Sequence, residues 1–194
     1  MMEDATAFSD RTLAHCMMAL LLGIGGLAGQ PCSAQQTTAE RWRAFRGEVV
    51  SPSLLVGALS MGGVDYVRNT PSSWRCGAGG YAARSGSHAG RFVVEAGTAH
   101  GLAAATGLSL RYVPRRTGRV GERVRHAVLG AVTARTADGT RVPNVPRVAA
   151  TYGAALAQDR WAHGELRPRG AVLSTAISLG VDVVSTVVIE FAAQ

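Results

Sequence analysis

The sequence has 194 residues, of which 47% are hydrophobic but only 6% aromatic, and its formal net charge is +7. This composition excludes a core of large aromatic rings, because Ala, Gly and Val supply most of the apolar content and must pack by close backbone approach. All 20 basic side chains are Arg. Guanidinium groups suit bidentate binding of phosphate or carboxylate, although a GC-rich genome would produce the same bias.

Residues 1–34 have the composition of a signal peptide. The apolar stretch from Met17 to Ala28 has the length of the hydrophobic region of such a peptide and is short for a membrane span. The small residues before Gln35 predict cleavage after Ala34, and export to the periplasm or outer cell envelope. The acidic start of the chain departs from the usual basic pattern, so a later start codon or an uncleaved anchor is an alternative. Cleavage leaves Cys76 as the only cysteine, which excludes an internal disulfide in the mature chain.

The mature chain is predicted to begin with a polar lead-in and then a helix. Residues 35–50 are polar and mixed in charge, and we expect them to be extended or frayed. Ser51 can cap a helix and Pro52 suits its first position, so a helix is expected over 53–67. Asn69-Thr70-Pro71 then predicts a turn.

A regular glycine spacing indicates that the next element, residues 79–106, is one long helix. The glycines recur in steps of seven and four residues, which is about 3.67 residues per turn. Each glycine destabilises a helix by about 1 kcal/mol relative to Ala, so we expect the stripe to pack closely against another helix. The helix-packing candidates are Gly79, Gly86, Gly90, Gly97 and Gly101.

Two further helices are expected before the C-terminal segment. The first is capped by Thr117 and runs to about Thr136, after which Asp138-Gly139 predicts a turn. The second is opened by Asn144 and covers 145–159. A polar loop follows it.

Residues 170–193 fit two patterns. Their valines favour a strand, and the alternation keeps an outer-membrane β-strand as an alternative. Small residues recur every seven positions from Ala171 to Ala192, which favours the helix that we predict. The elements together predict a mainly α fold, a bundle of about five helices with Gly/Ala-rich seams, in a single domain over 51–194.

Several of these positions form a spaced pattern. It reads Asp65-x3-Asn69-x-Pro71-x2-Trp74-x4-Gly79-Gly80-Tyr81-x2-Arg84, then Arg111-Tyr112, Gly139, Trp161 and Glu190-Phe191. Over residues 50–192 the chain resembles a family of small exported bacterial proteins of unknown function. The resemblance implies a helical fold and an envelope location, but no activity. The family often has Asp-Pro where this chain has Ser109-Leu110, and Gly where it has Arg75.

The sequence offers no convincing catalytic motif. Ala58-Leu59-Ser60-Met61-Gly62 is a degenerate G-x-S-x-G, but a nucleophile elbow needs a strand before the serine, and this serine falls in an expected helix. The histidines after residue 34 lack the i, i+4 spacing of metal ligands. We therefore expect neither a metal nor another cofactor.

Six arginines within fifteen residues form a basic cluster around one tyrosine. Such a cluster can bind phosphates, and export makes an anionic lipid surface a better partner than nucleic acid. A solvated helix face is the alternative. The candidate anion- or lipid-binding residues are Arg111, Tyr112, Arg115, Arg116, Arg119, Arg123 and Arg125.

Asp182 lies in the middle of the last predicted helix, on a face that also carries serines. If that face packs inward, the carboxylate is buried and needs a cationic partner. The candidate partners for this structural ion pair lie on the glycine-striped helix and are Arg84, His88 and Arg91.

These observations predict a non-enzymatic, exported envelope protein that is structural or associates with a membrane surface or with itself. The alternative is a soluble periplasmic module that binds a small or lipidic ligand between its helices. That alternative requires an apolar cavity.

Overall fold

The computed structural model describes residues 37–115 and 117–192, and the predicted signal peptide lies outside them. The chain divides into two units, 1–32 and 33–194, and everything described belongs to the second. The described part is mainly helical, which confirms the predicted fold class. Its helices are α2 (Thr38–Val49), α3 (Pro52–Val67), α4 (Ala78–Ala105), α5 (Val120–Val132), α6 (Val145–His163) and α7 (Pro168–Ala192). Its strands are β1 (Thr133–Arg135) and β2 (Arg141–Pro143).

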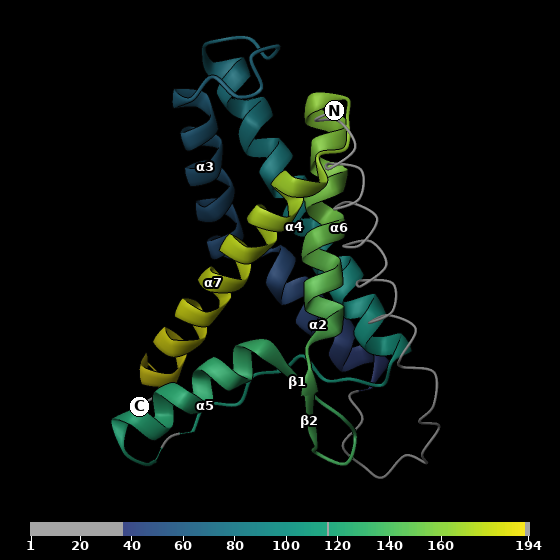
Figure 1. Cartoon of the computed structure of the whole chain (residues 1–194), viewed down its shortest axis with the longest axis vertical. Coiled ribbons are helices and arrows are strands. Elements are labelled where there is room, and N and C mark those ends of the chain that lie inside the picture. The colour runs from purple at the N-terminus through teal and green to yellow at the C-terminus, as the bar shows by residue number, and fades with distance from the viewer. Residues whose placement is uncertain (1–36, 116, 193–194) are drawn as a thin grey trace, which may run out of the picture. The chain divides into compact units, whose positions relative to one another are not determined.

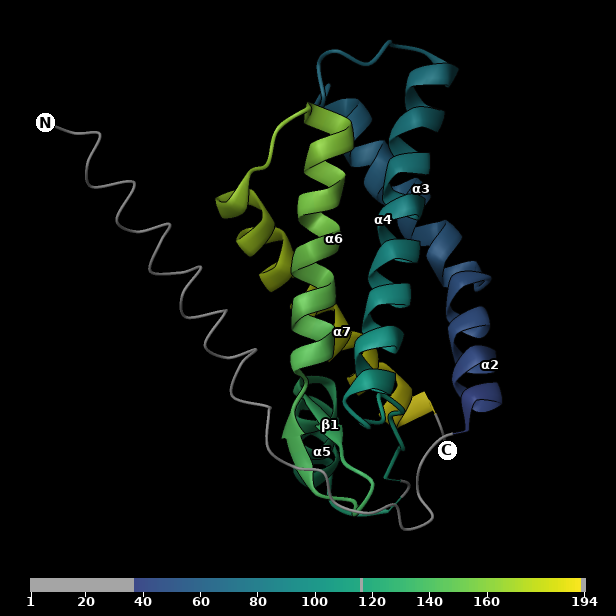
Figure 2. The ribbon, with the colours of Figure 1, turned by 90° about the vertical axis from the view of Figure 1, so that its right-hand side faces the viewer.

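Helix α4 is at the centre of the packing. It lies between α3 and α6, and α2 packs against it as well (Figure 2). Helix α7 packs against α6 and α5. Figure 1 shows α5 and the β1–β2 hairpin at one end of the bundle, with the loop that joins α3 to α4 at the other.

The ends of the helices follow from local capping. The hydroxyl of Ser51 accepts a hydrogen bond from Leu54 N at 3.2 Å, and Pro52 is the first residue of α3. Asn144 caps α6 in the same way, through Arg147 N at 3.2 Å. The structure confirms the predicted helices over 53–67, 79–106 and 145–159, the last with four additional residues.

The expectation of an extended lead-in over 35–50 is wrong. Residues 38–49 form α2, because Thr37 and Glu40 make a capping box: the Thr37 hydroxyl accepts from Glu40 N at 3.2 Å, and the Glu40 carboxylate accepts from Thr37 N at 2.8 Å. The sequence Thr37-Thr38-Ala39-Glu40 contains this signal.

The helix expected from Thr117 to Thr136 is shorter than predicted. It begins at Val120 without a side-chain cap and ends at Val132. The next three residues form β1, which pairs antiparallel with β2. Gly139 adopts the left-handed conformation in the connecting turn, with φ of +85°, as the Asp138-Gly139 pair predicts.

The glycine stripe of α4 does not form the expected close seam. A Cβ added to Gly79, Gly86 or Gly101 would meet no atom within 4 Å, and at Gly90 and Gly97 it would only reach ordinary contact at 3.8 Å. The inward face of α4 is instead occupied by charged side chains. The close approaches occur elsewhere. A Cβ on Gly62 of α3 would lie 2.7 Å from the Ser85 backbone, and one on Gly80 would overlap the Arg75 carbonyl oxygen.

Polar and apolar side chains are distributed unusually over this fold. Of the twelve buried hydrophobic residues, eleven are Ala and the other is Leu108. Large apolar side chains lie mostly on the outside, especially on α3 and α7. Several Arg, Glu and His side chains are buried, so ionic contacts rather than large aliphatic groups fill the space between the helices.

Candidate functional site

The inward face of α4 carries four ionisable side chains at helical spacing. Arg84, His88, Arg91 and Glu95 follow one another at intervals of four, three and four residues, which places them on one side of the helix. Each is no more than 7% exposed. Buried ionisable groups require partners, so the contacts of these four side chains organise the interior.

Arg84 holds the loop between α3 and α4 through backbone carbonyls rather than through a carboxylate. Its Nε donates to Thr70 O at 2.9 Å. Its two terminal nitrogens donate to four further carbonyl oxygens and to the Asn69 side chain. The carbonyls belong to Pro71, Trp74, Arg75 and Gly80. Pro71, Trp74 and Gly80 are positions of the N-x-P-x-x-W and G-Y-x-x-R segments, so Arg84 joins these two segments in one structural unit.

His88 pairs with the carboxylate of Asp65 on α3, with 2.7 Å between Nε2 and Oδ2. Its other nitrogen, Nδ1, lies 3.3 Å from the Gln158 amide nitrogen, which can only donate. The imidazole therefore carries its proton on Nε2 and donates it to Asp65. Gln158 occupies Nδ1, so within residues 37–115 and 117–192 this His–Asp pair is not completed by a hydroxyl group into a catalytic triad.

Arg91 connects α4 to the polar side of α7. It donates to Ser174 Oγ at 2.7 Å and to Ser178 Oγ at 3.1 Å. Its Nε has no partner among the described residues. The turns of α7 that carry Ser174 and Ser178 therefore face α4, whereas Ser185, further along the helix, is exposed.

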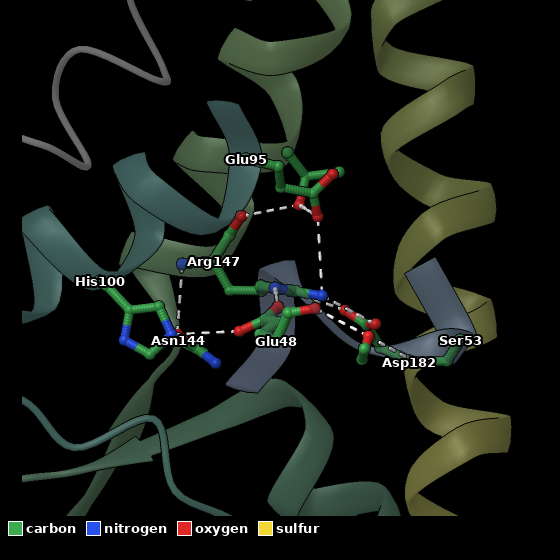
Figure 3. Close-up of polar contacts among 9 residues, drawn as sticks. Glu48, Ser53, Glu95, His100, Asn144, Arg147 and Asp182 are labelled. Carbon is green, nitrogen blue, oxygen red and sulfur yellow. Dashed lines mark hydrogen bonds and ion pairs between the residues drawn. The ribbon is translucent and has the colours of Figure 1, made fainter. Parts of the chain in front are cut away.

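Arg147 is the centre of the largest ionic contact, which joins four helices (Figure 3). From α6, its Nε and a terminal nitrogen donate to both Asp182 oxygens of α7 at 2.9 and 3.0 Å. It also pairs with Glu48 of α2 at 3.3 Å and with Glu95 of α4 at 3.6 Å. Thr151 donates to Glu95 at 2.8 Å. We call these four charged residues, Glu48, Glu95, Arg147 and Asp182, the Arg147 network.

The Arg147 network contains more negative than positive charge. Three carboxylates share one guanidinium, and His100 adds an imidazole 3.1 Å from Glu48. The second oxygen of Glu95 is buried and has no hydrogen-bond partner among the described residues. Within the described ranges no three His, Cys, Asp or Glu residues are placed to hold a metal ion.

A second buried ionic contact ties the end of α7 to α5. Glu190 is fully buried, and its carboxylate accepts from Arg123 Nε at 3.3 Å, from Arg115 N at 2.9 Å and from the Tyr112 hydroxyl. Burial raises the pKa of the Tyr112 phenol, and the hydrogen bond to Glu190 raises it further. The Arg123 guanidinium stacks over the Phe191 ring at 4.4 Å.

The structure corrects the predicted partner of Asp182. The carboxylate does pair with an arginine, but the partner is Arg147 of α6, and none of the three candidates on α4 contacts it. Arg84 binds carbonyls, His88 binds Asp65, and Arg91 binds serines. The hypothesis failed because α6, not α4, packs beside that turn of α7.

The basic cluster around Tyr112 is not one surface. Arg123 is buried in the Glu190 contact, whereas Arg111, Arg115, Arg119 and Arg125 are exposed. Arg116 lies outside the described residues.

Sequence reasoning missed Arg147, Glu48 and Asp65. Arg147 lies three residues after the Asn144 cap, so the sequence indicates that it is in a helix. No local signal indicates which face of that helix it occupies.

Comparison with known proteins does not place this chain in a family. It matches no protein-family model, and no curated protein or solved structure is detectably similar to it.

Proposed function

We propose that this chain is a non-enzymatic structural protein of the cell envelope that helix α7 anchors in a membrane. The observation that carries the proposal is the division of α7 into two faces. Its outer face carries Leu173, Ile177, Val181, Val184 and Val188, each between 57% and 64% exposed. Steps of three and four residues place these side chains in one stripe.

Four polar side chains of α7 lie outside this stripe and are paired with other helices. Ser174 and Ser178 bind Arg91, Asp182 binds Arg147, and Glu190 binds Arg123. In membrane helices, ionisable residues face the bundle interior and pair there, because lipid offers them no partner. The two ionisable side chains paired here, Asp182 and Glu190, follow this rule, because each forms an ion pair with an arginine of another helix.

The length of α7 also suits a bilayer. Its 25 residues span about 37 Å, against a hydrocarbon thickness of about 30 Å. It is long and apolar enough to cross a membrane, yet only 11% of its most apolar stretch is buried, unlike the core helix of a soluble protein. Among the described residues, the bent pair α2 and α3 is a second candidate span.

The alternative of a soluble module with a ligand between its helices receives less support. One pocket, beside the loop between α3 and α4, is lined by Asn69, Thr70, Ser72, Ser73 and other mainly polar residues. A second pocket, beside the hairpin, is lined largely by Arg, Ser and Thr. Neither has the aliphatic lining that a lipidic ligand needs.

Membrane extraction of variants tests the proposal. We expect a C-terminally tagged chain to remain in membranes through high-salt and carbonate washes. The double variant Ile177→Arg/Val184→Arg places two charges in the apolar stripe and should move the chain to the soluble or aggregated fraction, because each charge costs about 3 kcal/mol at a helix centre.

A matched control is Val120→Arg, at an exposed position where α5 begins. This variant should remain carbonate-resistant. Release of the parent chain by carbonate, or equal extraction of the double variant and the control, would contradict anchoring through α7.

A further inference from the structure

A small basic pocket lies where the β1–β2 hairpin meets α5 and the segment after α4. Its lining includes Ser109, Arg111, His126, Thr133, Arg135 and Arg141. We call this site the hairpin pocket. Of the three arginines that line the pocket, only Arg111 also belongs to the basic cluster predicted from sequence. The hairpin supplies the other two, Arg135 and Arg141, from later in the chain.

The hairpin pocket has an excess of positive charge. No carboxylate belongs to its lining. Arg111, Arg135 and Arg141 form no ion pair with any residue that the structure describes, in contrast to Arg123 and Arg147. Arg111 acts on the Glu40 carboxylate only at a distance, and Tyr112 at the edge of the pocket is already engaged by Glu190.

The sheet register brings two of these charges together. Arg135 and Arg141 are direct cross-strand partners on β1 and β2. Arg135 also bridges Ser109 through both backbone hydrogen bonds, at 2.8 and 3.2 Å, and Arg111 follows two residues later on the irregular segment beside β1. Like charges directly opposite one another destabilise an antiparallel pair. An anion between them would remove that repulsion.

His126 positions one of the guanidinium groups. Its Nδ1 lies 3.0 Å from an Arg141 terminal nitrogen, and since guanidinium only donates, Nδ1 is the acceptor. The proton is then on Nε2, which donates to Val113 O at 3.0 Å. This contact holds Arg141 at the pocket with its remaining donors available.

We propose that the hairpin pocket binds a phosphate group. Three guanidinium groups from three neighbouring segments suit the several oxygens of a phosphate, which they can bind through paired, charge-assisted hydrogen bonds. The enclosed space is about 10 Å³, room for about one water molecule. The phosphate therefore sits at the mouth, between the exposed side chains of Arg111 and Arg135.

The phosphate can come from a lipid headgroup or from a free phosphate ester. The hairpin and α5, which contribute residues to the pocket, lie at the same end of the bundle (Figure 1), and α5 packs against α7. The lipid source rests on the proposed function, because it requires that end of α7 to reach the headgroup layer. Binding of free phosphate requires no membrane.

Binding by the full chain tests the site. In a neutral detergent the probe is inorganic phosphate, with chloride at equal ionic strength as reference. In a separate, detergent-free arm the probes are vesicles of phosphatidylcholine with or without phosphatidylglycerol. The variant is Arg135→Gln/Arg141→Gln. The matched control is Arg119→Gln/Arg125→Gln, which removes the same charge from exposed positions outside the pocket.

We expect the pocket variant to lose about tenfold or more in affinity for the phosphate probe, and the control to lose no more than about twofold. Binding of inorganic phosphate would identify a free phosphate as ligand, and binding of phosphatidylglycerol vesicles alone would identify the headgroup. Equal losses in variant and control, or no preference for phosphate over chloride, would overturn the site.

Two readouts separate folding and anchoring from binding. Removing the cross-strand repulsion should leave the melting temperature of the pocket variant unchanged or higher in phosphate-free buffer. The pocket variant should also remain carbonate-resistant, so a failure of membrane anchoring and a failure of phosphate binding give different results.

Discussion

At the scale of single residues, the function of a charged side chain here depends on which helix it meets. Arg84 binds five carbonyl oxygens and an amide, Arg91 binds serines, Arg123 binds Glu190, and Arg147 binds three carboxylates. All four are arginines in helices, and nothing in their immediate sequence distinguishes these roles. The guanidinium fork can serve each of them, because it offers five donors in a plane.

Replacement of Arg147 by Ala should destabilise the fold by about 2–4 kcal/mol, since it leaves partly buried carboxylates without their cation. The double variant Arg147→Ala/Asp182→Asn should recover part of that loss, because one uncompensated charge is removed with its partner. Denaturant unfolding followed by far-ultraviolet circular dichroism measures both. Arg43→Ala, on the exposed side of α2, is the control. An Arg147→Ala chain as stable as the control would show that the network is dispensable.

At the scale of elements, glycines in this chain indicate two different things: a regular spacing indicates a helix, and a single glycine can mark a close approach of two helices. The regular stripe on α4 predicted the helix correctly but not the contact, since a Cβ at most of its positions would meet open space. Gly62 carries no periodic signal, yet its Cα faces the Ser85 backbone where α3 crosses α4. Periodicity reports helical conformation, whereas close approach depends on the face that a second helix covers.

Two glycine substitutions separate these meanings. Gly62→Ala should destabilise the chain by about 1–3 kcal/mol, because the new methyl group overlaps the Ser85 backbone and forces α3 away from α4. Gly86→Ala should stabilise it by up to about 1 kcal/mol through helix propensity alone, because nothing lies within 4 Å of the new Cβ. Thermal unfolding of the two variants against the parent measures the difference. Equal shifts in the same direction would contradict the assigned α3–α4 contact.

At the scale of the whole molecule, the described unit has two chemically different ends. The α3–α4 loop, with the exposed Cys76, lies at the end of the bundle where α7 begins, and the hairpin lies at the opposite end, where α7 finishes beside α5 (Figure 1). If α7 crosses the bilayer as proposed, the loop and the hairpin are on opposite sides of it. The charged contacts along α4 and α6 then lie between these two ends.

Cysteine labelling tests this arrangement. In a chain with Cys16→Ser and Cys32→Ser, Cys76 should react with a membrane-impermeant maleimide from one side only. A second chain with Cys76→Ser and Ala137→Cys, in the hairpin turn, should react from the other side. Labelling of both from the same side in intact cells or sealed vesicles would be inconsistent with a crossing by α7, whereas labelling after detergent treatment controls for reactivity.

The sequence by itself determined most of the helices of this protein. Ser51-Pro52 and Asn144 are local signals for helix starts, because a cap satisfies backbone donors within one turn. Thr37-x2-Glu40 carries the same information for α2. It also indicated that Asp182 needs an arginine, since a buried carboxylate requires a cation in any fold.

Only the tertiary structure decided which residues meet. Arg147 and Asp182 are 35 residues apart, and Tyr112 and Glu190 are 78 apart. Their pairing depends on which helices pack side by side, which local sequence does not encode. The same is true of the hairpin pocket, where strand register brings Arg135 opposite Arg141. Capping is a local interaction, whereas ionic networks and binding pockets arise from contacts between distant segments, and this is the physical reason for the division.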